Sequence, residues 1–272
     1  MTPPRIFGIP ARDAPVVAVL RRGPSDWCQI GRWDVGARPA YQPGSWVRAT
    51  MYPQRCDLSP DGRWLCYFTL RRRADWQAGP TYVAVSRLPW ATALAAWGSC
   101  GTWTRGMHFV DPAVHEAGRP DEGDDEPLRR SHGLAFTRPV SFAVERRRGW
   151  TETSDSPPRR EHDMWDERRA PHVTLQKMRP GGGPTLQVSG MFAAFREFDT
   201  GRYGEPTYRL VGEEPAGLPG VLWADWSPDG RLLVATLDGQ LQVRDEGRVT
   251  WEADLSALTP DPQPAPPEAS RW

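Results

Sequence analysis

The stretch Ser59–Arg63 reads Ser-Pro-Asp-Gly-Arg, and the same five residues recur at Ser227–Arg231. The first copy leads directly into Trp64–Leu70 and the second into Leu232–Leu237, both of them apolar runs. Asp-Gly beside such a run is a strong hairpin signal, because glycine tolerates the positive φ of a tight turn and proline presets φ at its first corner. Both copies are therefore predicted to be tight turns that open into well-buried strands.

The spacing of the two copies agrees with a repeat architecture. Asp61 and Asp229 lie 168 residues apart, which is four intervals of 42. Propeller blades of the WD-repeat kind, each a four-stranded sheet, recur at about 40–45 residues. Further turns are then expected near the intermediate positions and one interval upstream. Candidates that contain Gly or Pro are present at Arg22–Pro24, Ser99–Gly101, Arg147–Gly149 and Pro180–Gly183.

The composition also favours short elements joined by turns. Pro (29) and Gly (26) together exceed a fifth of the 272 residues, which disfavours long helices. Short apolar or alternating runs at regular spacing are typical of all-β domains. Besides the two strands that follow the repeated turns, strands are predicted at Val16–Leu20, Trp27–Val35, Thr81–Val85, Leu134–Thr137, Val140–Val144, His172–Gln176, Thr185–Val188, Thr207–Val211 and Gln240–Val243. The predicted fold class is therefore all-β.

Leu58–Phe68 and Trp226–Ala235 each consist of an apolar residue, the pentapeptide and a strand-like run. These strings resemble the WD-repeat-like units of TolB-type β-propellers, and the propeller domains of prolyl-oligopeptidase-type peptidases are similar. The resemblance implies a disc-shaped propeller that binds partners through its top, bottom or central channel. The spacing of four intervals of 42 indicates about five or six blades, some of them degenerate. It implies no catalytic residues, because the peptidase relatives carry theirs in a separate hydrolase domain. A β-sandwich is the alternative fold.

The same pattern suggests the domain organisation. Residues 1–258 are expected to form a single propeller-like domain with irregular loops near 116–130 and 151–169, where charged residues are dense. The proline-rich tail over 259–272 is expected to be extended or disordered. The N-terminus does not resemble a secretory leader, and no apolar run approaches the ~18 residues of a membrane helix, so we expect a cytoplasmic protein without a membrane partner.

One segment, Leu88–Gly98, is predicted to be a short helix. It has a proline near its start, an Ala-rich interior and a terminal glycine, which are helix entry, propensity and stop signals. Helical spacing would place Trp90, Leu94 and Trp97 on one face. That face is expected to pack on the sheet of its own domain or, alternatively, to bind a protein partner, which makes these three residues the candidate binding residues.

The charge balance argues against a nucleic-acid partner. The 34 basic and 34 acidic side chains cancel, and short basic runs such as Arg71–Arg73 and Arg146–Arg148 are interpreted as solvated loops of mixed charge. All the basic side chains except Lys177 are arginine. We attribute this pattern to coding bias rather than to function.

No catalytic residue, metal site or cofactor is predicted. The chain has no Gly-x-Ser-x-Gly elbow, no phosphate-binding loop and no His-Glu-x-x-His motif. Cys28, Cys56, Cys66 and Cys100 form no Cys-x-x-Cys pair. They are expected to be free thiols in a reducing cytoplasm, although Cys56 and Cys66 lie on opposite arms of the first hairpin and could form a bridge.

Two functions are compatible with these observations. The first is a non-catalytic, cytoplasmic interaction module or scaffold that binds a protein partner. The alternative is an enzyme or a carbohydrate or small-molecule binder that uses the propeller channel, where carboxylates from different blades could converge. A channel lined by two or more carboxylates would favour the alternative, and a channel filled by apolar side chains would exclude it.

Overall fold

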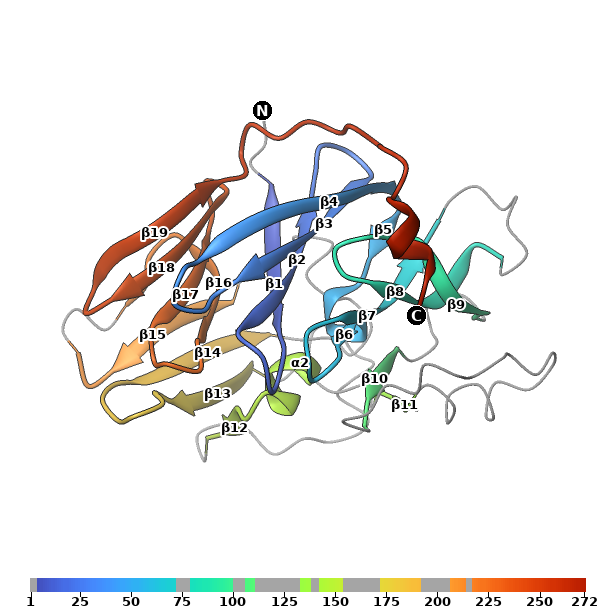
Figure 1. The fold of residues 1–272 in the computed structure, drawn as a ribbon. Helices are drawn as coiled ribbons and strands as arrows, with labels where there is room; N and C mark the ends of the chain where they lie inside the picture. The colour runs from blue at the N-terminus through green and yellow to red at the C-terminus, as the bar shows by residue number, and fades with distance from the viewer. Residues whose placement is uncertain are drawn as a thin grey trace.

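The computed structural model describes residues 4–71, 79–99, 106–110, 133–137, 142–153, 172–191, 206–213 and 217–272. The described strands form five antiparallel sheets, so the all-β prediction is confirmed (Figure 1). Neighbouring strands in a sheet follow each other along the chain, apart from β5 and β6, which both pair with β7. The loop predicted at 116–130 and most of the one at 151–169 lie outside the described residues.

The first sheet contains β1 (Arg5–Pro10), β2 (Val16–Arg22), β3 (Trp27–Asp34) and β4 (Ala40–Arg48) in that order. The central strand β2 is buried along nearly its whole length, which explains its continuous apolar run. By contrast, β4 forms an edge of the sheet and is mostly half-buried or exposed.

The second sheet contains β5 (Thr50–Met51), β7 (Trp64–Leu70), β8 (Thr81–Arg87) and β9 (Ala93–Gly98), with β6 (Asp57–Leu58) paired to β7. A short 3-10 helix, η1 (Pro53–Arg55), joins β5 to β6. Two further strands, β10 (Met107–Phe109) and β11 (Leu134–Phe136), form a small separate sheet.

The remaining two sheets each contain four strands in chain order. One contains β12 (Thr151–Glu152), β13 (His172–Met178), β14 (Thr185–Met191) and β15 (Thr207–Val211). The other contains β16 (Val221–Trp226), β17 (Leu232–Thr236), β18 (Gln240–Asp245) and β19 (Arg248–Asp254). The helical elements α2 (Ala143–Arg147) and η5 (Pro267–Ser270) are short.

Both Ser-Pro-Asp-Gly-Arg copies form the predicted turns, between β6 and β7 and between β16 and β17. Gly62 and Gly230 have φ values of +74° and +82°, the region that glycine adopts readily. In the first turn the amide of Gly62 donates to the carbonyl of Ser59 over 2.9 Å, and the Ser59 hydroxyl accepts from the amide of Trp64 over 2.9 Å. The amide of Arg63 donates to Oδ1 of Asp61 over 3.1 Å, so serine, aspartate and glycine in the motif are explained by turn geometry.

The other predicted turns and strands have mixed outcomes. Arg22–Pro24 joins β2 to β3 and Pro180–Gly183 joins β13 to β14, as predicted. The prediction of a strand at Val140–Val144 is wrong for its described part, residues 142–144. Ala143 and Val144 belong to the helix α2. The side chain of Gln54 accepts from the amide of Val144 over 3.0 Å, a tertiary contact at the first turn of α2 that sequence periodicity does not reveal.

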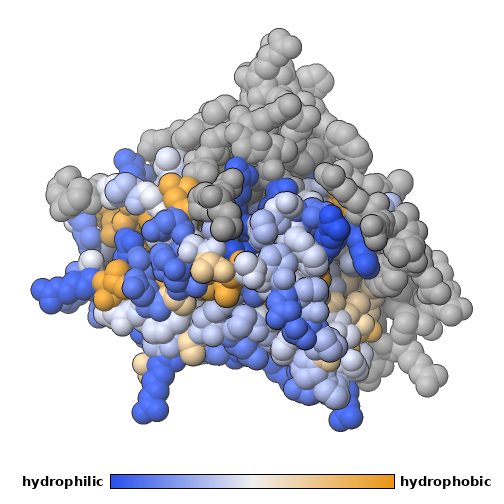
Figure 2. Space-filling view, turned by 90° about the horizontal axis from the view of Figure 1, so that it is seen from above, coloured by the Kyte–Doolittle hydropathy of each residue, from blue (hydrophilic) through white to orange (hydrophobic). Residues whose placement is uncertain are grey.

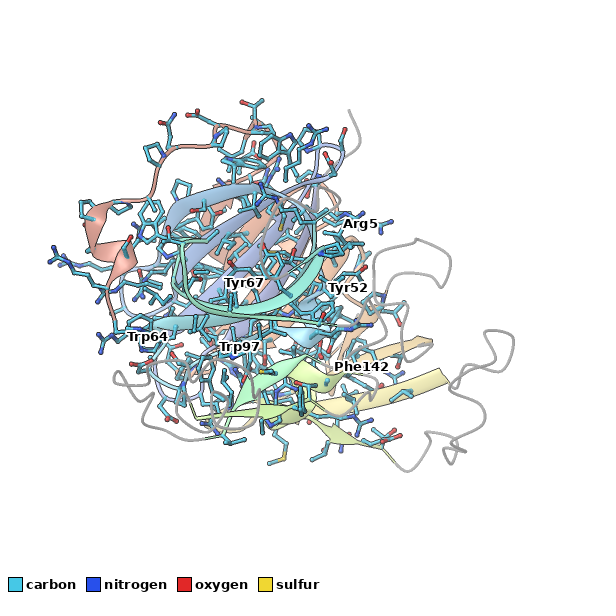
Figure 3. All side chains as sticks on the ribbon, turned by 90° about the vertical axis from the view of Figure 1, so that its right-hand side faces the viewer. Arg5, Tyr52, Trp64, Tyr67, Trp97 and Phe142 are labelled. Carbon is cyan, nitrogen blue, oxygen red and sulfur yellow. The ribbon has the colours of Figure 1, made fainter. Side chains whose placement is uncertain are left out.

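The helix predicted over Leu88–Gly98 is also wrong. Residues 88–89 form a turn, and Ala93–Gly98 is the edge strand β9, antiparallel to β8. Trp97 is buried in one cluster with Trp64, whereas Leu94 is a half-buried position of the strand and Trp90 lies before it (Figure 3). Pairing with β8 and the burial of Trp97 outweigh the modest helix propensity of the alanines. The three candidate binding residues therefore do not share a helix face.

Edge strands of several sheets lie against one another. β1 contacts β16 and β6, and β6 in turn contacts β10. Gly8 in β1 lets the Trp223 ring of β16 come close, since a Cβ at this position would lie 2.6 Å from the ring. The largest buried cluster accordingly draws on the first, second and last sheets, with members such as Ile9, Leu58 and Leu233.

The C-terminal segment beyond β19 crosses from the last sheet over the first to the second (Figure 1). Arg21 in β2 donates to the carbonyls of Leu255 over 2.8 Å and Leu258 over 2.9 Å. At its far end Ala269 is fully buried and the Trp272 ring lies 5.4 Å from that of Trp64. The segment therefore ties three sheets together.

The described surface offers only scattered apolar side chains. The large exposed ones, such as Met178 and Val249, come from separate strands, and Figure 2 shows small apolar patches among polar ones on the face that it displays. None of the described helices is both long enough and apolar enough to cross a bilayer.

Candidate functional site

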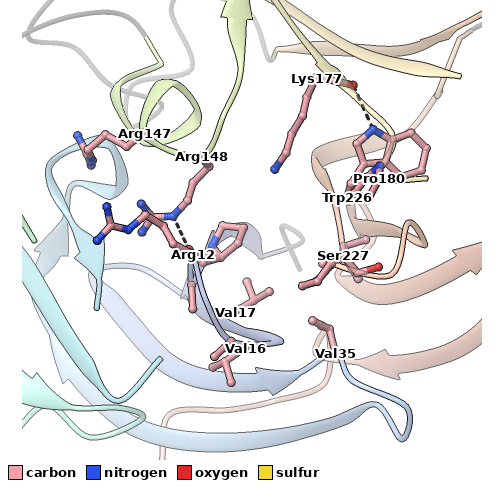
Figure 4. A pocket seen from close by; sticks show the side chains of 15 residues that line it. Arg12, Val16, Val17, Val35, Arg147, Arg148, Lys177, Pro180, Trp226 and Ser227 are labelled. Atoms are coloured by element: carbon pink, nitrogen blue, oxygen red, sulfur yellow. Dashed lines mark hydrogen bonds between the residues drawn. The ribbon is translucent and has the colours of Figure 1, made fainter. Parts of the chain in front are cut away.

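A pocket of about 240 Å³ lies where the first sheet, the β12–β15 sheet, the β16–β19 sheet and the end of α2 meet. In Figure 4, Val16, Val17 and Val35 lie below it, Trp226 and Ser227 stand at one side and Lys177 reaches down from β13. The second Ser-Pro-Asp-Gly-Arg turn thus supplies part of its wall. We call this site the cationic pocket, because its lining contains Arg12, Arg147, Arg148 and Lys177.

Arg148 is the most firmly held of these cations. Its side chain is 4% exposed. Its Nη2 donates to Oδ1 of Asp57 over 2.7 Å and to the carbonyl of Leu58 over 3.1 Å. Its Nε donates to the carbonyl of Pro10 at the end of β1. Asp57 also accepts from the amide of Phe109 over 2.9 Å, so this ion pair links β1, β6 and β10 behind the pocket.

Lys177 is anchored in a similar way on the opposite side. Its Nζ donates to Oδ1 of Asp225 over 2.7 Å, and its side chain is 19% exposed. The buried Asp225 carboxylate accepts in addition from the amide of Trp226 over 2.7 Å and from the indole of Trp150 over 3.4 Å. Because these donors fix the carboxylate, they also fix the direction in which the ammonium group points.

Arg147 and Arg12 complete the positive lining. Arg147 donates to the carbonyl of Cys56 over 3.2 Å, and its Nε lies 3.7 Å from Oδ1 of Asp57. Burial lowers the pKa of Arg147, and the nearby Asp57 carboxylate opposes that shift. Arg12, in the β1–β2 connection, is exposed and makes no hydrogen bond to another described residue.

A second polar network lies behind Arg147. Burial raises the pKa of Glu145 to about 7, although the Gln54 amide donates to its two carboxylate oxygens over 3.0 and 3.2 Å. Burial together with the positive charge of Arg147 lowers the pKa of His108 to about 4. His108 is therefore neutral at physiological pH and adds no charge to the site.

The charge of the pocket is unbalanced. Among the described residues that line it, four are cationic and none is acidic. Behind the lining, Asp57 is shared by Arg148 and Arg147 and Asp225 binds Lys177, so four positive charges face two carboxylates. Such an arrangement favours binding of an anion, and neither carboxylate is free to act as a general acid or base.

The sequence-predicted binding residues lie elsewhere. Leu94 and Trp97 lie in β9 of the second sheet and Trp90 lies in the connection before it, and none of the three lines the cationic pocket. The interpretation of Arg146–Arg148 as a solvated loop is wrong for Arg148, which is buried and ion-paired. The sequence shows that Lys177 is the only lysine. Its position in the pocket depends on three sheets that are far apart in the sequence and meet only in the folded chain.

Two further expectations concern thiols and metals. Cys28, Cys56 and Cys66 are thiols rather than disulfides, as predicted, and all three are buried. Burial raises the pKa of Cys28 to about 12. Cys100 lies outside the described residues. The described parts of the chain bring no three His, Cys, Asp or Glu side chains together in a way that could hold a metal ion.

No protein-family model matches the chain, and no curated protein matches it either.

Proposed function

We propose that the chain is a non-catalytic, cytoplasmic β-propeller module that binds a protein partner at the cationic pocket. The observation that carries the proposal is the pocket itself, in which unbalanced positive charge lies above an apolar floor of Val16, Val17 and Val35. Recognition surfaces commonly combine a desolvated apolar centre with a few fixed charged groups.

The arrangement of the sheets supports the propeller part of the proposal. Each of three sheets consists of four strands in chain order, and the contacts of β1 with β16 and β6 bring edge strands of three sheets together. This is the pattern expected of blades around a central axis. Five blades would result, with β10 and β11 as a degenerate one. The presence of several separate sheets is less compatible with a two-sheet sandwich.

The alternative function, an enzyme that uses the channel, is less well supported. Glycoside hydrolysis requires two carboxyl groups that face the substrate. Asp57 and Asp225 are instead held by Arg148 and Lys177 behind the lining. The indole of Trp226 in the pocket wall keeps a carbohydrate or small-molecule binder open as the second candidate, since an aromatic ring can stack on a sugar.

Affinity capture from native lysate tests the proposal when wild type is compared with two charge-reversal variants. Arg12→Glu reverses an exposed charge in the pocket, and Arg248→Glu reverses an exposed charge on the edge strand β19 as the matched control. We expect a stoichiometric partner with wild type and Arg248→Glu, and loss of that partner with Arg12→Glu. Nuclease treatment should leave capture unchanged. Equal recovery with all three proteins would contradict the proposed binding site.

A further inference from the structure

Three of the pocket cations retain hydrogen-bonding capacity. Arg148 uses Nε and Nη2 for its bonds, and its Nη1 donates to no described residue. The ammonium group of Lys177 has three donors, of which Asp225 accepts one. Arg12 adds a guanidinium group with no bond to another described residue. Donors from three different elements are therefore available at one site.

The surroundings of these donors strengthen their attraction for an anion. Val16, Val17, Val35 and Leu233 line the same pocket, and apolar walls lower the local dielectric constant. Charge-assisted hydrogen bonds are stronger than neutral ones under these conditions. Asp225 and Asp57 lie behind Lys177 and Arg148 and orient these two side chains. The two carboxylates neutralise only part of the positive charge of the pocket.

We infer that the cationic pocket binds a group with two negative charges, a phosphate monoester or a pair of carboxylates, held by Lys177, Arg148 and Arg12. Two uncompensated positive charges match a dianion, and the volume of about 240 Å³ leaves room for an apolar carrier against the valine floor. This inference rests on the proposed function for its biological setting, in which the dianion belongs to the bound segment of the partner.

Lys177 offers a direct readout, because it is the only lysine in the chain. An amine-reactive acetylating reagent therefore modifies one side chain, and mass spectrometry of the peptide that contains Lys177 gives its modification rate. The rate would be measured with increasing inorganic phosphate, with increasing succinate, and with sodium chloride at matched ionic strength. Since the purified chain is used without a partner, the result does not depend on whether the capture experiment succeeds.

We expect phosphate, succinate or both to slow acetylation of Lys177 in a saturable manner, while sodium chloride at equal ionic strength has a much smaller effect. Protection by phosphate alone indicates a phosphate monoester, and protection by succinate alone indicates paired carboxylates. Arg12→Gln should weaken the binding of the protecting anion about tenfold, which is the effect of losing one charged hydrogen bond. Arg248→Gln, the control on β19, should leave its affinity unchanged.

The inference is overturned if neither dianion protects Lys177 beyond the sodium chloride control. It is equally overturned if protection occurs but is unchanged in Arg12→Gln, because the anion would then lie outside the cationic pocket. In either case, selective loss of a partner with Arg12→Glu would still support the proposed function, so the two failures are distinguishable.

Discussion

At the scale of single residues, the cationic pocket depends on pairs whose members are far apart in the chain. Lys177 in β13 and Asp225 in β16 form one such pair, and Arg148 and Asp57 form the other. In each pair the carboxylate is buried, so that its charge is compensated mainly by the cation in front of it.

Lys177→Met should therefore lower the free energy of unfolding by about 2–3 kcal/mol, since it leaves the buried Asp225 carboxylate without its cation. The double variant Lys177→Met with Asp225→Asn should recover most of this loss, because the uncompensated charge is then removed. Urea denaturation of the three proteins measures the effect. A double variant no more stable than Lys177→Met would contradict this account of the pair.

Glu145 makes stability depend on pH. Its pKa is about 7 in the folded chain against an ordinary value of 4.5, so in this range the folded state holds a proton that the unfolded state has lost. Its stabilising contribution is full below the unfolded pKa and is lost as the pH rises through the folded pKa. The change is at most about 1.4 kcal/mol per pH unit.

Glu145→Gln should remove this dependence. As the pH rises from about 5 to about 7, the wild type should lose stability relative to Glu145→Gln, so the difference in free energy of unfolding shifts in favour of the variant. Urea denaturation at the two pH values provides the measurement, and the comparison with wild type cancels the other titrating groups. A difference that is independent of pH would show that Glu145 titrates normally.

At the scale of elements, sequence reasoning succeeded where local geometry decides the structure. The repeated Ser-Pro-Asp-Gly-Arg turns require only residues within the turn, and a strand such as β2 is recognisable because it is apolar throughout. The helix predicted at Leu88–Gly98 failed because pairing with β8 and burial of Trp97 decide the conformation there. The cationic pocket could not be predicted, since Arg12, Arg148 and Lys177 meet only after three sheets have formed.

The repeated turn also makes a testable contact with the first sheet. Gly62 has a φ of +74°, and a Cβ there would lie 2.8 Å from Cβ of Val16. Gly247, in the β18–β19 turn, has a φ of +77° with no atom within 4 Å of such a Cβ. Gly247→Ala should cost about 1 kcal/mol from backbone strain, and Gly62→Ala should cost clearly more because a steric clash is added. Equal losses in thermal or urea unfolding would contradict the close packing of this turn.

At the scale of the whole molecule, the C-terminal segment links three sheets that also contact one another through the edge strands β1, β6 and β16. Ala269→Glu places a charge at a fully buried position of η5 and should lower the free energy of unfolding by about 2 kcal/mol or release the segment. Ser270→Glu, at the exposed neighbouring position, is the matched control and should have little effect. Urea unfolding followed by tryptophan fluorescence reports both outcomes, since Trp272 leaves Trp64 on release.

We propose that the cationic pocket, formed where the sheets meet, is the surface that binds a protein partner. The most direct test is to load the captured complex on a column and wash it with the dianion that protects Lys177, or with sodium chloride at equal ionic strength. We expect the dianion to release the partner and sodium chloride to leave it bound. A partner that stays bound under the dianion wash, or that both washes release equally, would contradict it.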